Sequence, residues 1–266
     1  MEVSFADCKR ELLKESNRKA LAAYQAWRAR RGWDEVITFV EGFTHRHLFE
    51  LSSSKLRKVI DRSEHALGNV QKEEAIKSVE NFTCPFALQH IFHGYLEDTG
   101  VAPTWQDFNS LIHKEARGKW LEHLRDRSKD FPEVRELIES YGRDEAWHRI
   151  KRAVRWRLGK FYLSAMRELD LLVRLRERDV PLRYHLLADV LLRVDFWTPS
   201  TFVCIYFENK NYRSRKHPTE HFFNEADVLH QTIQRQGFGR IWPATEESVQ
   251  QLVQQLKERD ASRWPV

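Results

Sequence analysis

Two neighbouring runs of strand-forming residues restrict the fold of this chain more than any other feature. The runs Ala188–Trp197 and Thr201–Glu208 are rich in β-branched and aromatic residues, and Thr198-Pro199-Ser200 joins them. Such residues favour strands, and a short segment that contains Pro and Ser favours a turn. We therefore predict an antiparallel hairpin whose turn is centred between Pro199 and Ser200.

Further elements are predicted on both sides of this hairpin. A helix over Lys160–Glu177 and a short strand over Leu182–Leu187 precede it. After it, Pro218–Arg235 has helical periodicity, Gly239–Pro243 favours a fourth strand, and Glu246–Glu258 favours a final helix. The order is α-β-β-β-α-β-α. A hairpin and a helical crossover in one sheet predict a mixed sheet.

The chain up to residue 158 is predicted to be helical. Its periodic segments are rich in Leu, Ala, Glu, Lys and Arg, and Gly and Pro residues separate them. The segments are Lys9–Arg31, Ser53–Ala66, Gln71–Glu80, Pro85–Glu97, Trp105–Arg127 and Pro132–Tyr141. The sequence therefore predicts an α+β protein with an all-helical region over 1–158 and an α-β-β-β-α-β domain over 159–266.

Basic residues are concentrated in one segment of the chain. The net charge of the 266 residues is only +5, and 41% of them are hydrophobic, which is enough for a packed core. From Arg143 to Lys216, 17 Lys and Arg stand against 9 Asp and Glu, whereas the rest of the chain has 27 against 30. This segment is the expected binding region for a polyanionic partner.

Composition also indicates the environment of the protein. The three cysteines, Cys8, Cys84 and Cys204, are odd in number and far apart, which argues against a disulfide framework. No apolar run reaches the roughly 20 residues of a membrane span, and the first residues lack the pattern of a signal peptide. We expect a soluble, cytoplasmic protein without a membrane partner.

The candidate catalytic residues lie at the end of the hairpin. Its second strand ends in Glu208-Asn209-Lys210, and side chains two residues apart on a strand point the same way. The predicted register places Asp189 opposite Lys210 on the same face. Asp195 shares this face but pairs with Cys204, nearer the turn. The register favours Asp189 as the partner carboxylate, and a shifted register or a bulge would favour Asp195 instead.

A third carboxylate comes from the preceding helix. At 100° per residue, Glu168 lies on the edge of the apolar face formed by Phe161, Leu172 and Leu175. A carboxylate that faces a sheet costs free energy unless something compensates its charge. A metal ion would compensate it, and so would a salt bridge to Arg176.

These residues resemble the PD-(D/E)XK phosphodiesterase superfamily, which includes restriction endonucleases and Holliday-junction resolvases. The resemblance rests on Glu168, on Asp189 (or Asp195), on the Glu208-Asn209-Lys210 tripeptide and on the predicted order of elements, and it covers residues 159–243. Ala188 and Val194 stand where the family motif has proline before its aspartate. The resemblance implies a restriction-endonuclease-like core with a mixed central sheet.

It also implies a metal-dependent mechanism. Asp189 and Glu208 would bind Mg²⁺ (or Mn²⁺), with Glu168 and the backbone carbonyl of Asn209 as further ligands. The metal would polarise the phosphodiester and lower the pKa of a bound water. Lys210 would orient that water and offset the charge that develops in the transition state.

Basic residues flank this proposed site on both sides in the sequence. Arg213, Arg215 and Lys216 follow the catalytic tripeptide directly. The preceding helical stretch carries Arg149, Arg152, Arg155 and Lys160. Cations in such numbers are suited to phosphate contacts, which give affinity without sequence selectivity. We expect both groups to bind the nucleic-acid backbone.

The expected function is therefore hydrolysis of DNA phosphodiester bonds by a Mg²⁺-dependent nuclease. Small nucleases of this kind are typical of bacterial defence, mobile-element or repair systems, often with a partner ATPase or specificity subunit. Two alternatives remain open: a non-catalytic DNA-binding subunit with a nuclease-like fold, and a helical scaffold protein in which the hairpin is only structural.

Overall fold

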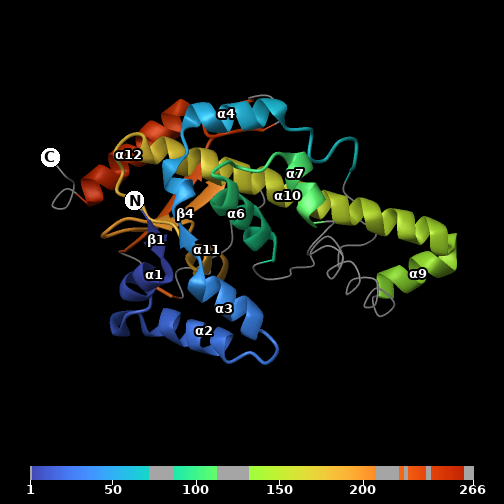
Figure 1. Cartoon of the computed structure of the whole chain (residues 1–266), viewed down its shortest axis with the longest axis horizontal. Helices are drawn as coiled ribbons and strands as arrows, with labels where there is room; N and C mark the ends of the chain where they lie inside the picture. Colours follow the sequence, from blue (N-terminus) through green and yellow to red (C-terminus); the bar gives the residue numbers. More distant parts are fainter. Residues whose placement is uncertain are drawn as a thin grey trace.

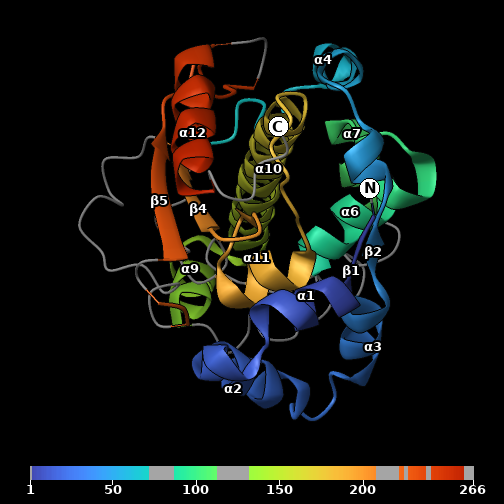
Figure 2. The ribbon, with the colours of Figure 1, turned by 90° about the vertical axis from the view of Figure 1, so that its left-hand side faces the viewer.

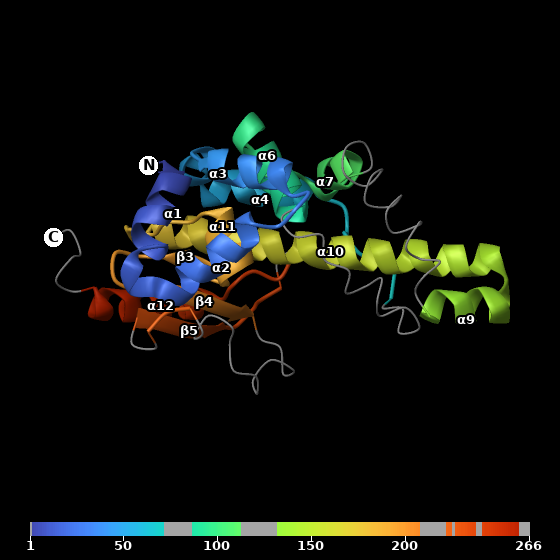
Figure 3. The ribbon, with the colours of Figure 1, turned by 90° about the horizontal axis from the view of Figure 1, so that it is seen from below.

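One long helix, α10 (Arg143–Arg176, 34 residues), is the axis around which the rest of the chain is arranged (Figure 1). The computed structural model describes residues 2–71, 87–112, 132–207, 222–224, 227–237 and 241–260. Two views at right angles agree on three layers (Figures 2 and 3). The sheet and α12 lie on one side of α10 and α11, and α3, α4, α6 and α7 lie on the other.

The first half of the described chain is mainly helical, as the composition predicts, with one two-stranded pairing of β1 and β2. Thr104 begins α7 with a capping box to Asp107, so the predicted helix start at Trp105 is confirmed. The predicted helix over Lys9–Arg31 is in fact broken between α1 and α2. The elements are β1 (Val3–Ser4), α1 (Phe5–Leu12), η1 (Glu15–Asn17), α2 (Arg18–Arg28), α3 (Asp34–Gly42), β2 (Thr44–His45), η2 (His47–Glu50), α4 (Ser53–Arg62), α6 (Ala87–Thr99), α7 (Trp105–Leu111) and α9 (Pro132–Tyr141).

Helices α9 and α10 form an arm. α9 ends at Tyr141, Gly142 turns the chain with φ +82°, and α10 then runs back along α9. Positive φ is a conformation that glycine adopts without strain. Figure 3 shows this end of the molecule extending away from the layers that surround the other half of α10.

The three-stranded sheet of the C-terminal half is mixed, as predicted. Its order is β3 (Phe196–Trp197), β4 (Phe202–Phe207) and β5 (Val228–Ile233). β3 and β4 are antiparallel, and β4 and β5 are parallel. Phe196 pairs with Val203, which is the register expected for a turn centred between Pro199 and Ser200. The α+β class is confirmed.

Three predicted elements of this half are wrong in whole or in part. The strand expected over Ala188–Trp197 is mostly helix, α11 (Leu186–Leu192), and only its last two residues form β3. The His185 side chain caps α11 by accepting from the Leu187 N–H at 3.1 Å. Arg193 then ends the helix in the left-handed region at φ 59°. A seven-residue segment with six Leu, Ala and Val residues fits a buried helix as well as a strand, and the local caps decide between them.

The helix predicted over Pro218–Arg235 is also wrong where the structure describes it. Residues Val228–Ile233 form β5, because each of them pairs in parallel with a residue of β4. The strand predicted over Leu182–Leu187 is reduced to one bridge between Arg183 and Trp197. Near the predicted Gly239–Pro243 strand, the pairing is a bridge between Arg235 and Ala244. The last helix, α12 (Glu246–Arg259), matches its prediction closely.

The predicted boundary at residue 158 falls inside α10. Gly159, which the composition indicates as a break, lies within the helix. A Cβ atom at this position would lie 2.7 Å from Leu67 Cδ2 and 3.0 Å from the Ala66 carbonyl oxygen. The glycine therefore permits close packing of the segment after α4 against α10.

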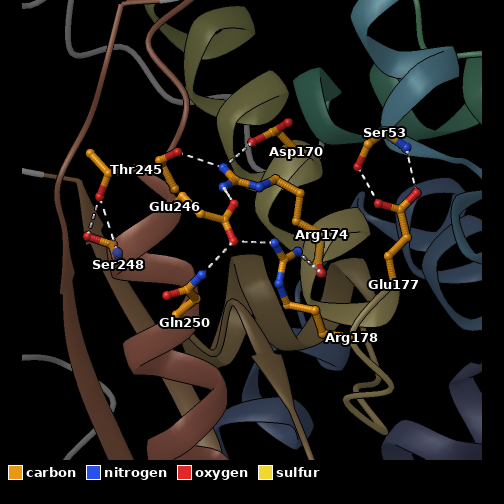
Figure 4. Close-up of polar contacts among 10 residues, drawn as sticks. Ser53, Asp170, Arg174, Glu177, Arg178, Thr245, Glu246, Ser248 and Gln250 are labelled. Atoms are coloured by element: carbon orange, nitrogen blue, oxygen red, sulfur yellow. Dashed lines mark hydrogen bonds and ion pairs between the residues drawn. The ribbon is translucent and has the colours of Figure 1, made fainter.

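An arginine cluster holds the C-terminal end of α10 (Figure 4). Arg174 donates to the Ala244 carbonyl at 2.6 Å and to Glu246 Oε2 at 2.7 Å, and it lies 3.4 Å from buried Asp170. Glu177 accepts from the Ser53 N–H at 2.8 Å, at the start of α4. These contacts tie α10 to α12 on one side and to α4 on the other. Despite the length of α10, no helix among the described residues combines the length and apolar character that a bilayer crossing needs.

Candidate functional site

Three carboxylates from separate elements line one cleft of about 530 Å³. Glu168 comes from the middle of α10, Asp189 from α11, and Asp195 from the residue before β3. All three are half-buried. Four cations line the same cleft: Arg157, Lys160, Arg167 and Arg193. The site thus combines an acidic group with a basic surround.

The two aspartates reach the cleft through different local structures. Asp189 lies in the first turn of α11, which the His185 side chain caps. After Arg193 turns the chain, Asp195 joins the sheet: its N–H donates to the Val203 carbonyl at 2.9 Å, and its Oδ2 accepts from the Ile205 N–H at 2.6 Å. The preference for Asp189 assumed that Asp189 lies on a strand paired with β4, and this assumption is wrong because Asp189 lies on a helix. Asp195 is the aspartate attached to the sheet, and both aspartates line the cleft.

The close approach of these acids changes their pKa values. Burial raises the pKa of Glu168 well above its usual range, and the charges of Asp189 and Asp195 raise it further. Burial, followed by the charge of Asp189, raises the pKa of Asp195 to about 8. Burial also raises the pKa of Asp189 to about 6, against a hydrogen bond from Tyr184 that lowers it. Desolvation thus disfavours the charged form of each acid, and neighbouring acids add to this effect for Glu168 and Asp195.

The cations are also desolvated. Burial lowers the pKa of Arg167 and of Lys160, and the charge of Arg235 lowers both further. Arg167 lies over the Phe207 ring at 5.8 Å, and its buried Nε has no hydrogen-bond partner in the part of the chain that the structure describes. A buried N–H donor without a partner costs free energy. An anion in the cleft would supply the missing acceptor.

A chain of hydrogen bonds leads from Asp189 into the core. The Tyr184 hydroxyl donates to Asp189 Oδ2 at 3.1 Å and lies 2.9 Å from His93 Nε2. Since a hydroxyl has one proton, His93 must donate from Nε2 when Tyr184 donates to the aspartate. Tyr184 and His93 are 3% and 6% exposed, so the pair is held firmly. It fixes one oxygen of Asp189 and leaves the other for a ligand.

The structure brings together part of the residue set predicted from sequence. Glu168, Asp189, the alternative Asp195 and Lys160 line the cleft. β4 ends at Phe207, which also lines it. The next residues of the predicted site, Glu208, Asn209 and Lys210, lie outside the described residues. So do the basic residues Arg213, Arg215 and Lys216.

The remaining predicted cations lie elsewhere on α10. Arg149 contacts Glu145 at 2.9 Å and lies over the Tyr141 ring at 4.5 Å. Arg155 packs over Trp105 at 5.6 Å. Arg152 belongs to the same helix, nearer the arm than the cleft. Neither Arg149, Arg152 nor Arg155 is among the residues that line the cleft.

Sequence reasoning missed several residues of the cleft. Arg167 could have been found from helical spacing, because it lies seven residues after Lys160 and so shares its face of the helix. Arg193 and Tyr184 could not be recognised from the sequence as residues of the site, because the segment between them was predicted as a strand. His93 comes from α6, far away in sequence, and nothing in its local pattern indicates a site.

The donor chemistry of the three carboxylates fits a hard divalent cation. Oxygen ligands suit Mg²⁺, which commonly takes one or two carboxylates and completes its shell with water and phosphate oxygens. No group of three His, Cys, Asp or Glu residues within the described ranges is arranged to hold a metal ion. The fit is therefore to one or two of these carboxylates, which would bind the ion together with water and a phosphate.

Searches with family models, against curated proteins and against solved structures find no match to this chain. The function must therefore be inferred from the chemistry of the cleft.

Proposed function

We propose that this protein is a Mg²⁺- or Mn²⁺-dependent nuclease that hydrolyses DNA phosphodiester bonds in the cleft between α10, α11 and the sheet. One observation carries the proposal: Glu168, Asp189 and Asp195, from three separate segments, line one cleft together with four cations. An acidic centre suits a divalent cation, and a basic surround suits the phosphates of a nucleic-acid strand.

The energetic cost of this arrangement supports a functional role. Burial raises the pKa values of all three acids, the charge of Asp189 raises those of Glu168 and Asp195 further, and none of the three forms a salt bridge with another described residue. Such groups are costly to retain for stability alone. Clusters of acids with raised pKa values in a cleft are typical of functional sites. A divalent cation would relieve the repulsion and hold the acids in their charged forms.

In the proposed mechanism, the carboxylates bind the metal and the cations bind the substrate. A bound divalent cation polarises the phosphodiester and lowers the pKa of a bound water. Arg157, Lys160, Arg167 and Arg193 position the strand and offset the charge that develops on the phosphate. Tyr184 orients Asp189. Glu208 and Lys210, which follow Phe207 in the sequence, complete the proposed catalytic set, with Lys210 orienting the attacking water.

Part of the order of elements supports the proposed relation to the PD-(D/E)XK superfamily. A helix carrying Glu168 precedes an antiparallel pair, β3 and β4, and a parallel neighbour, β5, follows, but the helix α11 stands where the resemblance implies a first strand. The tripeptide Glu208-Asn209-Lys210 follows β4 directly in the sequence. Asp195 rather than Asp189 takes the sheet position in this proposal, because Asp195 hydrogen-bonds to the backbone of β4.

A cleavage assay tests the proposal. Purified protein is incubated with single-stranded, linear duplex and supercoiled DNA in Mg²⁺, in Mn²⁺ and in EDTA. We expect cleavage that requires the metal and is lost in Asp195→Asn. Asp98→Asn is the matched control, because Asp98 is an exposed carboxylate on α6 outside the cleft, and this variant should cleave as the wild type does. Metal-independent cleavage, or unchanged cleavage by Asp195→Asn, contradicts the proposal.

A further inference from the structure

Aromatic side chains line the same cleft as the acids and the cations. Phe161 comes from α10, and Phe207 comes from the end of β4. Both are half-buried, so part of each side chain is accessible. Aromatic rings beside cations are the combination that binds single-stranded nucleic acids, because the bases stack on the rings while the backbone phosphates meet the cations.

One cation of the cleft lies over one of these rings. The Arg167 guanidinium lies 5.8 Å from the centre of the Phe207 ring. Glu168, the next residue on α10, is one of the three acids. A base that contacts Phe207 would therefore bring its own phosphate beside Arg167 and near the acidic group.

The size of the cleft limits what can enter it. A B-DNA duplex, whose major groove alone is about 12 Å wide, does not fit into a cleft of about 530 Å³. Small-molecule pockets that enclose their ligand are typically about 300–1,000 Å³, so this cleft is of the right size for one or two unpaired nucleotides. The acids line this cleft and are half-buried, so the reacting phosphate must enter it.

We propose that the strand bound for cleavage is single-stranded at the cleft, with an unpaired base against Phe161 and Phe207. This inference rests on the proposed nuclease function and specifies its substrate. Single-stranded DNA, flaps and frayed ends are therefore expected substrates, and an uninterrupted duplex is not. The cations Arg157, Lys160, Arg167 and Arg193 bind the phosphates on both sides of that base.

Binding measured without cleavage tests this inference. The full chain carrying Asp195→Asn is titrated with fluorescent single-stranded DNA and with a duplex of equal length at one salt concentration. We expect at least tenfold tighter binding of the single strand. Adding Phe207→Leu, which keeps most of the apolar volume but removes the ring, should weaken single-strand binding about tenfold, in the range measured for loss of one stacked base.

Two controls separate stacking from folding. Phe161→Leu should weaken binding in the same direction as Phe207→Leu. Phe39→Leu removes a half-buried ring on α3, outside the cleft, and should leave binding unchanged. Equal or tighter binding of the duplex, with no effect of Phe161→Leu or Phe207→Leu, overturns the inference while metal-dependent cleavage by the wild type still stands. Absence of both DNA binding and cleavage overturns the nuclease function as well.

Discussion

Replacing Asp195 by Asn should stabilise the metal-free protein at alkaline pH. The side chain keeps its shape, and its oxygen can still accept from the Ile205 N–H. What the variant loses is a buried negative charge beside Asp189 and Glu168. A carboxyl whose folded pKa lies above its unfolded pKa contributes stability at low pH and loses it as the pH rises toward the folded pKa. For Asp195 this window runs from the ordinary value of 3.8 to about 8.

The magnitude follows from the pKa shift after allowance for solvent in the cleft. If screening by solvent leaves a shift of about two pKa units, the variant and the wild type differ by roughly 3 kcal/mol in free energy of unfolding, at about 1.36 kcal/mol per unit. For a chain of this size, that corresponds to a rise in melting temperature of about 6–12 °C. The gain should be present at pH 8 in EDTA and should shrink toward pH 5. Adding Mn²⁺ should stabilise the wild type and not the variant, because a ligand stabilises only the state that binds it.

The stability that depends on buried histidines changes with pH in the opposite direction, so it must be separated from the effect of Asp195. Burial lowers the pKa values of His45, His93 and His185, so stability from these groups is lost as the pH falls below about 6.5. They affect wild type and variant alike. The measurement is therefore the difference in melting temperature between Asp195→Asn and wild type across pH 5–8, with Asp98→Asn as the control. A difference that stays flat with pH, or a variant less stable at pH 8, refutes the reasoning.

Three further changes test other parts of the account. Gly159→Ala should destabilise the protein by about 1–3 kcal/mol in urea denaturation, because its Cβ would overlap Leu67 and the Ala66 backbone. The control Gly94→Ala, whose Cβ meets only a side-chain atom at 3.7 Å, should not destabilise it. Equal stabilities of the two variants would contradict the packing argument. Tyr184→Phe should weaken Mn²⁺ binding measured by calorimetry while leaving the melting temperature within a few degrees, and unchanged affinity would remove Tyr184 from the site. Lys210→Ala should abolish cleavage without weakening DNA binding, and a variant that cleaves at the wild-type rate would exclude Lys210 from the mechanism.

The parts of the fold that could be predicted are those with strong local signals. Thr245 caps α12, and Glu246 begins it where the sequence indicates. The Thr198-Pro199-Ser200 turn fixes the β3–β4 register. The segment before the turn could not be predicted, because Leu186–Leu192 is apolar enough for either a strand or a helix. The cap by His185 and the left-handed Arg193 decide it, and both depend on tertiary contacts such as His185 Nε2 with the Phe43 carbonyl at 3.2 Å.

The candidate site was predictable in its chemistry but not in its geometry. Glu168 was recognised because an acid on an apolar helix edge needs a partner, and both aspartates were named. Their placement depends on the fold of α11, so the choice between them could not be made from register. The chain Asp189–Tyr184–His93 joins α11 to α6 over more than 90 residues of sequence, and no local pattern indicates such a contact.

Calorimetric titration of the metal-free protein with Mn²⁺ tests the central claim most directly, because it needs no knowledge of the natural substrate. Wild type, Glu168→Gln, Asp195→Asn and the control Asp98→Asn are compared at pH 8. The account predicts saturable binding to the wild type and to Asp98→Asn, with that binding lost or strongly weakened in Glu168→Gln and Asp195→Asn. Equal Mn²⁺ binding by all four proteins would contradict a metal site formed by Glu168 and Asp195.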